Sequence, residues 1–154
     1  MQVSASKIMP CLWFDGQAEA AAEFYTSIFP NSRITSVSRS PGEDRAMTVG
    51  FELDGRSFIG LNGGPQYTFS EAVSFQIYCD DQAEVDRYWN SLTDGGSEGP
   101  CGWLKDKFGL SWQVVPKALP EIMSSGDAET SGRVMQAMMQ MKKLDIAALQ
   151  QAAG

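Results

Sequence analysis

The first half of the chain alternates apolar and polar positions in a pattern that predicts one helix among four strands. Residues 7–14 form a short apolar run ending at Asp15-Gly16, which is typical of a buried strand, and Pro10 places that strand at a sheet edge or at a bulge. Residues 17–29 carry apolar side chains at the three- and four-residue steps of an amphipathic helix. Three more strands are predicted, the last two joined by the hairpin signal Asp54-Gly55. They cover residues 33–39, 46–53 and 56–61.

The second half repeats this order of elements without repeating its residues. Residues 73–79 alternate as a strand, and residues 82–93 gather their apolar side chains on one face of a helix. Two strands, 100–104 and 110–115, flank a turn in which Gly109 takes the left-handed conformation. A short extra strand is predicted around Ser97. Each half therefore has the order of a β-α-β-β-β unit.

Beyond Pro116 the pattern is helical and has no counterpart in the first half. Helices are predicted over residues 118–123, 128–141 and 145–152, with a break at residues 124–127. We expect this extension to cover the sheet or a partner subunit.

These patterns together favour an α+β fold. The strands come in antiparallel clusters, whereas a Rossmann-type dehydrogenase or methyltransferase alternates strands and helices along a longer parallel sheet. A chain of 154 residues is long enough for one sizeable core, so we expect a single domain over residues 1–154.

Charge and cysteine content narrow the range of partners. The formal net charge of -7 repels phosphate backbones and anionic lipid, which argues against nucleic acid. No window approaches the roughly 20 apolar residues of a membrane span, and residues 1–7 are polar, so we expect neither a membrane segment nor export. Three widely spaced cysteines fit neither a disulfide framework nor a CxxC motif. The predicted location is the cytoplasm.

The sequence contains no histidine. This removes the usual general base, the commonest zinc ligand and every Ser-His or Cys-His pair. Nucleotide-binding signatures are missing too, because Asn62-Gly63-Gly64-Pro65 lacks the GxGxxG spacing and no GxxxxGK[ST] motif occurs. We expect these glycines to form a turn after a strand.

The remaining reactive side chains have structural explanations. Cys11 and Cys101 have no basic neighbour in sequence, so we expect both to be small buried apolar residues. Several carboxylates lie at predicted turns or strand ends, where such groups are usually solvated or cap a turn. They are Glu52, Glu71, Asp80, Asp81 and Asp106. No catalytic residue is assigned.

A cavity is the alternative to a filled core for the aromatic side chains. Strand alternation places Cys11 and Trp13 on one face, and aromatic walls with a few polar anchors would suit a small, partly apolar molecule. Ordinary core packing would explain the aromatics as well. Gln76 and Gln113 lie in mid-strand, so they need hydrogen-bond partners if buried, or they face outward. The candidate ligand contacts are Cys11, Trp13, Asn62, Gln66, Phe69, Gln76, Trp103 and Gln113.

Four segments carry a family resemblance. They are PCLWFDGQAEAAAEFY (residues 10–25), the FPNS that follows, FELDGRSFIGLNGGP (residues 51–65) and CGWLKDKFGLSWQVVP (residues 101–116). With the order of elements, they resemble the PhnB-like branch of the vicinal oxygen chelate superfamily (glyoxalase/bleomycin resistance protein/dioxygenase), whose members often carry the label 3-demethylubiquinone-9 3-methyltransferase.

The resemblance covers nearly the whole chain and implies its architecture. It implies paired βαβββ modules, about residues 7–62 and 73–116, whose curled mixed sheets enclose a cavity, with residues 117–154 as a helical tail. Members are usually homodimers. Whether the modules pair within one chain or across two stays open.

Metal enzymes of the superfamily place histidine, glutamine or glutamate on facing strands of that cavity. Aligning their D-x-x-G-x-x-x-E pattern puts Gln113 at the usual glutamate position. The histidine positions fall near Met9 or Cys11 and near Ala72, and neither methionine nor alanine can replace imidazole for a hard divalent ion. The resemblance therefore implies no catalytic metal, and we expect no cofactor.

Three hypotheses of function follow. The first is a metal-free protein that binds a small, partly apolar molecule, as resistance-type members of the superfamily do. The second is an enzyme, either a lyase, isomerase or dioxygenase of the superfamily or the methyltransferase of the label, although no S-adenosylmethionine site is visible. The third is a dimeric structural or regulatory domain with a filled interior. Because the metal-ligating histidines of the superfamily are missing, we favour the binding hypothesis over the enzyme hypothesis.

Overall fold

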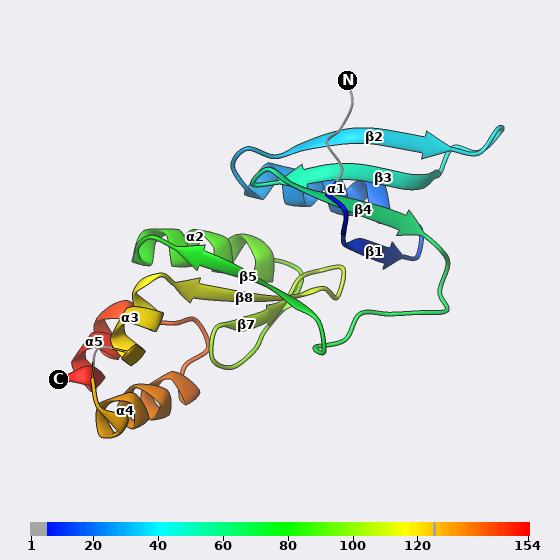
Figure 1. Ribbon diagram of the computed structural model, residues 1–154. Coiled ribbons are helices and arrows are strands. Elements are labelled where there is room, and N and C mark those ends of the chain that lie inside the picture. Colours follow the sequence, from blue (N-terminus) through cyan, green and yellow to red (C-terminus); the bar gives the residue numbers. More distant parts are fainter. Residues whose placement is uncertain (1–5, 125) are drawn as a thin grey trace. The chain divides into compact units, whose positions relative to one another are not determined.

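The computed structural model describes residues 6–124 and 126–154, which form two compact units, one ending at Thr68 and the other beginning at Phe69 (Figure 1). Each unit contains a mixed four-stranded sheet and a helix packed on it. The chain is an α+β protein, as the pattern predicts. Most of the polar start, residues 1–5, and residue 125 of the predicted helix break lie outside the described residues.

The first unit follows the predicted order of elements. Its sheet has the strand order β1-β4-β3-β2, in which β1 runs parallel to β4 and the other pairs are antiparallel. Of the two alternatives for Pro10, an edge or a bulge, the structure shows the edge, because β1 begins just after Pro10 and lies at the end of the row. The elements are β1 (Cys11–Phe14), α1 (Ala18–Ile28), β2 (Arg33–Arg39), β3 (Ala46–Leu53) and β4 (Arg56–Asn62).

The core of the first unit lies between α1 and its sheet. Small residues of α1 let the helix approach closely, since Ala18, Ala21 and Ala22 are fully buried beside Tyr25. The Tyr25 ring meets Phe51 of β3 with 6.2 Å between centroids. The hairpin between β3 and β4 has φ values of 49° at Asp54 and 76° at Gly55. Two consecutive positive φ angles characterise the predicted two-residue turn.

The second unit repeats this topology. Its sheet has the order β5-β8-β7-β6, again with the first strand parallel to the last. The short extra strand predicted near Ser97 is present as β6. Helix α2 covers one face of the sheet and buries Val85, Tyr88, Trp89 and Leu92. The elements are β5 (Ser74–Cys79), α2 (Gln82–Thr93), β6 (Ser97–Glu98), β7 (Trp103–Lys105) and β8 (Ser111–Pro116).

One architectural expectation is not met. The resemblance implies sheets that curl, whereas each sheet here is an open row of four strands. Within a unit, pairing along the row leaves one face covered by the helix and the other face open.

A buried carboxylate organises the β7–β8 hairpin. Asp106 is 3% exposed, and its Oδ1 accepts hydrogen bonds from the backbone N–H groups of Phe108 (2.8 Å) and Leu110 (3.1 Å). Its Oδ2 accepts from the indole N–H of Trp112 at 2.8 Å. Gly109 takes the predicted left-handed conformation, with φ of 88°. Asp106 therefore closes the turn and fixes the register of β7 against β8.

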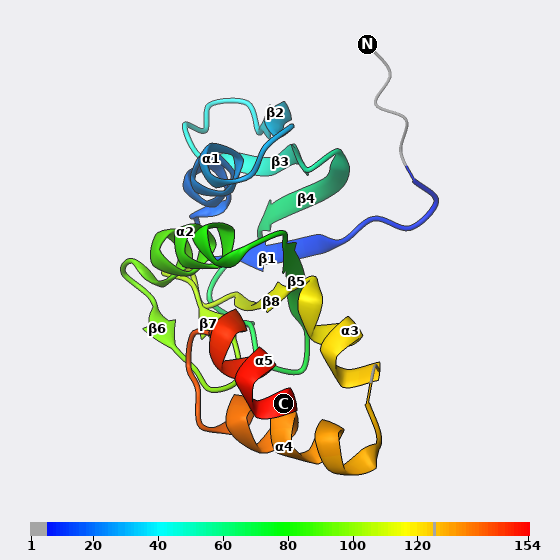
Figure 2. The same cartoon turned by 90° about the vertical axis from the view of Figure 1, so that its left-hand side faces the viewer.

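The C-terminal helices α3 (Ala118–Ser124), α4 (Ala128–Met139) and α5 (Ile146–Ala153) pack together within the second unit (Figure 2). They have a small core of their own around Val134, Leu144 and Leu149. The tail helices dock on their own unit, and their two expected roles, covering the sheet or covering a partner, stay predictions.

Backbone hydrogen bonds attach this tail to the loop before β7. The N–H groups of Cys101 and Gly102 donate to the carbonyls of Met141 and Lys142, both at 2.8 Å. At the start of α2, Gln82 donates to the Leu144 carbonyl and accepts from the Ile146 N–H. The tail therefore fixes the loop that leads into β7.

Asp106→Asn tests the organising role of this carboxylate. An amide that keeps its oxygen on the two backbone donors turns its NH₂ group toward the Trp112 indole N–H, which leaves buried donors facing each other. We expect a loss of about 2 to 3 kcal/mol in the free energy of unfolding, measured by chemical denaturation.

The matched control is Asp54→Asn in the other hairpin. Asp54 is exposed and has a positive φ that asparagine also adopts, so this variant should stay within about 0.5 kcal/mol of the parent. An equal loss in both variants would contradict the special role of Asp106.

Two glycine-to-alanine changes test the tail attachment. Gly102 has φ of 84°, and an added Cβ would lie 2.9 Å from the Val114 carbonyl oxygen and 3.1 Å from the Leu144 side chain. Gly102→Ala should cost about 2 kcal/mol or more. Gly132→Ala, on an exposed part of α4 where a Cβ meets nothing within 4 Å, should stabilise by about 0.5 to 1 kcal/mol. Thermal and urea unfolding measure both, and a neutral Gly102 variant would refute the attachment.

Candidate functional site

The open face of the second sheet carries a polar grid. In β5, β8 and β7 the side chains alternate between this face and the face under α2. Pairing aligns Gln76, Gln113 and Trp103 in one cross-strand row. The neighbouring row consists of Ser74, Ser111 and Lys105.

A chain of hydrogen bonds runs through this grid. The Tyr78 hydroxyl donates to Gln76 Oε1 at 2.9 Å, and Gln76 Nε2 donates to Gln113 Oε1 at 3.4 Å. Gln113 Nε2 then donates to Ser74 Oγ at 2.9 Å. Gln76 is exposed and Gln113 half-buried, so the mid-strand glutamines face outward and bond to each other. The two alternatives for these glutamines, a hydrogen-bond partner and an outward position, are therefore both found.

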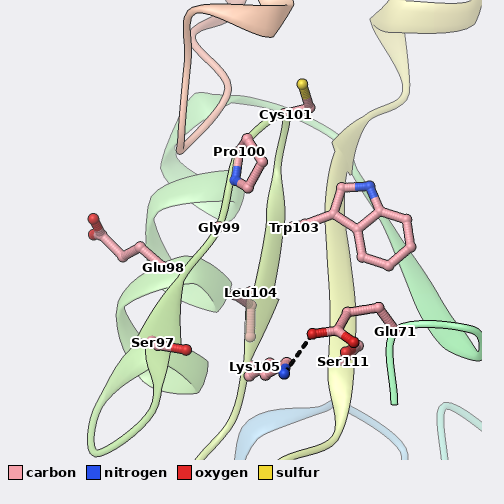
Figure 3. Close-up of a pocket in the computed structure, with 10 residues that line it drawn as sticks. All are labelled: Glu71, Ser97, Glu98, Gly99, Pro100, Cys101, Trp103, Leu104, Lys105 and Ser111. Carbon is pink, nitrogen blue, oxygen red and sulfur yellow. Dashed lines mark ion pairs between the residues drawn. The ribbon is translucent and has the colours of Figure 1, made fainter.

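A cavity of about 490 Å³ lies beside the grid in the second unit (Figure 3). Pro100, Cys101, Trp103 and Leu104 form its apolar wall. The loop that carries Cys101, with φ of 59°, is the one held by the C-terminal tail. The tail therefore shapes one side of the cavity.

The polar wall of the cavity consists of Glu71, Lys105 and Ser111, together with groups of the β6 edge. Lys105 Nζ forms an ion pair with the Glu71 carboxylate, drawn as the dashed line in Figure 3. The hydrogen bond from Lys105 lowers the pKa of the Glu71 carboxyl, so Glu71 is ionised at neutral pH. Ser111 is 1% exposed, and within the described residues its Oγ has no hydrogen-bond partner.

Sequence reasoning missed Lys105 and Ser111 and assigned Glu71 only a solvated or capping role. Strand alternation could have identified Lys105 and Ser111. Ser111 lies two residues before Gln113, and Lys105 two residues after Trp103, so strand alternation places them on the same face as those candidates. Nothing in the sequence pairs Glu71 with Lys105.

In the first unit, Trp13 lies against the loop that follows β4. Its indole N–H donates to the Gly64 carbonyl at 2.8 Å, and its ring meets Tyr67 edge-on with 4.9 Å between centroids. A Cβ on Gly63 would come within 2.3 Å of the indole ring. The glycines after Asn62 therefore form the predicted turn and leave room for the tryptophan.

The Asn62 amide is engaged in internal hydrogen bonds. Its Oδ1 accepts from the Ala18 N–H at 2.9 Å and its Nδ2 donates to the Ala46 carbonyl at 2.8 Å. Helix α1 makes no side-chain capping bond at Gln17, so Asn62 supplies the acceptor at the helix start from a distant strand. In this structure Asn62 joins β4, β3 and α1.

The remaining candidates are dispersed. Gln66 is exposed on the loop after β4, and Phe69 is half-buried at the start of the second unit. Cys11 is exposed, so the expectation that it is a buried apolar residue is wrong, because it lies on the open face of an edge strand. Cys101 is half-buried.

The buried thiol is Cys79. Burial raises its pKa to about 12, with a further contribution from the nearby carboxylates of Glu84 and Asp80. A thiol with this pKa stays protonated at neutral pH, so it is a poor nucleophile.

The donor set does not fit a divalent metal ion. Gln113, at the position that the resemblance gives to glutamate, already bonds to Ser74 and Gln76, and the histidine positions hold residues such as Ala72 that offer no imidazole. Among residues 6–124 and 126–154, no three His, Cys, Asp or Glu side chains come together as a metal site. No helix in the same ranges is both long and apolar enough to cross a membrane.

Comparisons with solved structures find the same fold. A PhnB protein from Bacillus cereus, described as a putative 3-demethylubiquinone-9 3-methyltransferase, is 33% identical, with a TM-score of 0.66 over 72% of this chain and 99% of that chain. Protein PA1353 from Pseudomonas aeruginosa is 20% identical, with a TM-score of 0.61 over 73% and 98%. The fosfomycin resistance protein FosX from Mesorhizobium loti is 16% identical, with a TM-score of 0.57 over 78% and 97%.

Sequence comparison gives one family. No curated protein matches the chain. A model of the 3-demethylubiquinone-9 3-methyltransferase family matches residues 6–115, the two β-α-β-β-β units without the C-terminal helices. With the Bacillus cereus relative, this match shows that the chain belongs to the PhnB-like 3-demethylubiquinone-9 3-methyltransferase family.

Proposed function

We propose that the protein binds a small, partly apolar molecule on the open face of its second sheet, without a catalytic metal. The cavity of about 490 Å³ beside Trp103 carries this proposal. Its volume falls in the range of about 300 to 1,000 Å³ that small-molecule sites occupy. An apolar wall with a few polar groups at one end is the usual composition of such a site.

The apolar wall of the cavity and the polar grid beside it have different roles in this proposal. The half-buried Trp103 indole offers a large rigid apolar surface, and the Pro100 ring lines the same cavity. Gln76 and Gln113 share a long hydrogen bond of 3.4 Å at an exposed position, so a ligand can replace it at little cost. Trp103 would supply affinity and the glutamines orientation.

The enzyme alternative finds less support in the side chains. The Asp106 carboxylate accepts three hydrogen bonds at the hairpin, and the Glu71 carboxylate pairs with Lys105. The Cys79 thiol is buried and protonated. The methyltransferase reaction in the family's name remains an outcome that ligand binding can test.

A ligand screen tests the binding proposal. Purified protein is titrated with flat apolar compounds, including a naphthoquinone, and with S-adenosylmethionine, and tryptophan fluorescence and thermal unfolding are recorded. We expect an apolar compound to quench fluorescence and to raise the unfolding temperature. Saturation at about 100 times the Kd should add about 2.7 kcal/mol of stability.

Two glutamine variants localise the site. Gln113→Ala should weaken the bound compound about fivefold, the effect of one neutral hydrogen bond, whereas Gln151→Ala on exposed α5 should not change its Kd. Failure of the whole panel to bind would remove the proposal. Binding of S-adenosylmethionine alone would favour the methyltransferase.

We also propose that the protein is a homodimer in the cytoplasm. The dimer follows from the family resemblance, and the exposed free thiol of Cys11 suits a reducing compartment. Sedimentation equilibrium should give twice the chain mass of 16.8 kDa at micromolar concentration. A monomer at all concentrations would refute the dimer.

A further inference from the structure

Two hydrogen-bond donors lie side by side at the polar end of the cavity. Lys105 of β7 and Ser111 of β8 are direct partners in the antiparallel register, and both line the cavity. Directly opposite residues place their Cβ atoms about 5 Å apart on the same face. The ammonium group and the hydroxyl group can therefore reach one common acceptor.

The hydroxyl group of Ser111 is buried, and the part of the chain that the structure describes offers it no partner. Its residue is 1% exposed, and within the described ranges nothing accepts from or donates to its Oγ. A hydroxyl buried in this way costs about 1 to 3 kcal/mol relative to a satisfied one. An acceptor supplied from the cavity would remove this cost, so the position favours a ligand with an oxygen at this end.

Glu71 already places a carboxylate on Lys105. It belongs to an exposed segment after Ser70, where the Ala72 N–H bonds to the Ser70 hydroxyl. The side chains of Lys105 and Glu71 are 42% and 62% exposed. Ion pairs this accessible contribute about 1 kcal/mol or less, so another carboxylate can displace Glu71.

We propose that Lys105 and Ser111 form the head-group site for a carboxylate whose aromatic or apolar body lies along Trp103, with Glu71 as the internal carboxylate that it displaces. This inference rests on the proposed binding function and names the class of ligand. The Lys105 ammonium supplies the charge and the Ser111 hydroxyl a second donor. The Glu71 segment moves outward when the ligand enters.

The cavity lining carries one ammonium group and two carboxylates, and both carboxylates already have partners. Lys105 is the cation in the cavity lining. The second carboxylate of the lining, Glu98, accepts a hydrogen bond from the Trp89 indole at 3.0 Å, so it is already engaged. An ammonium ligand would compete with Lys105 for Glu71 and would leave Ser111 without an anionic acceptor.

Three naphthalene probes of similar shape test the head group. Naphthoate, neutral naphthamide and cationic naphthylmethylamine are titrated into the full-length protein by isothermal titration calorimetry. We expect naphthoate to bind about tenfold more tightly than naphthamide, the effect of replacing neutral with charge-assisted hydrogen bonds, and the amine to bind weakest. The preference should shrink as salt is raised.

Charge variants distinguish an effect of the Glu71–Lys105 pair from an effect of the protein's net charge. Glu71→Gln should raise naphthoate affinity by about threefold to tenfold because it frees Lys105. Glu98→Gln changes the net charge equally and lines the same cavity, yet it should have little effect. Lys105→Met should abolish the preference for naphthoate, whereas Lys107→Met, at the exposed turn, should retain it.

Ser111→Ala separates ligand binding from stability, because it should lower affinity without destabilising the fold. Because the hydroxyl has no partner to lose, this variant should unfold at the same temperature as the parent or a higher one. Its affinity for naphthoate should nevertheless fall, by about fivefold.

Several results would overturn the inference. These are equal binding of naphthoate and naphthamide, tightest binding of the amine, equal effects of Glu71→Gln and Glu98→Gln, and unchanged naphthoate affinity in Ser111→Ala. If no naphthalene probe binds, the carboxylate site is wrong. The proposed function itself fails only if the wider panel, which includes ligands of other chemistry, also fails to bind.

Discussion

Three N–H groups converge on one buried carboxylate, and the geometry of the second unit depends on that convergence. Asp106 accepts hydrogen bonds from the turn, from the residue before β8 and from the Trp112 indole. The Trp112 side chain lies on the face of the sheet that α2 covers. A shift of β8 by one residue would turn Trp112 to the open face and Gln113 into the core. The Asp106 contacts therefore hold Trp103, Lys105, Ser111 and Gln113 in their places on the grid.

The two units share a topology but use their polar residues differently. In the first unit, the Asn62 amide is engaged in joining β4 to the start of α1 and to β3, and the Trp13 indole N–H is engaged with Gly64. In the second unit, the Ser111 hydroxyl is unsatisfied and the glutamines bond weakly to each other. On these equivalent sheets, Asn62 and Trp13 of the first unit complete the fold, whereas the polar groups of the second unit's open face form a weakly bonded grid beside the cavity.

Sequence patterns predicted the elements where local signals were strong. The alternation of residues 33–39 and 46–53 and the helical spacing of residues 82–93 match β2, β3 and α2 in both bounds. The first strand is shorter than predicted, since β1 begins only after Pro10, and α4 ends at Met139 rather than at residue 141. Periodicity identifies a face of an element, but its ends depend on caps and tertiary contacts. Cys11 was misplaced for a related reason, because alternation does not say which face is covered.

The site was only partly predictable. Gln76 and Gln113 were identified as unusual glutamines in mid-strand and Trp103 as a candidate aromatic contact, and the structure places all three in one row. The Glu71–Lys105 pair joins residues from a loop and a strand, and no periodic signal relates them. The unsatisfied state of Ser111 depends on every neighbour around it, so only coordinates can reveal it.

The tail is joined to the cavity loop through main-chain atoms. The bonds from Cys101 and Gly102 end on the carbonyls of Met141 and Lys142, while the Lys142 side chain forms an ion pair with Glu98 and the Met141 side chain packs on the core of the tail. The main-chain bonds themselves set one steric requirement, which is a glycine at position 102. Because the family match ends at residue 115, the cavity rim is held by a segment outside the part of the chain that the family shares, so a change in the tail can reach the rim without altering either sheet.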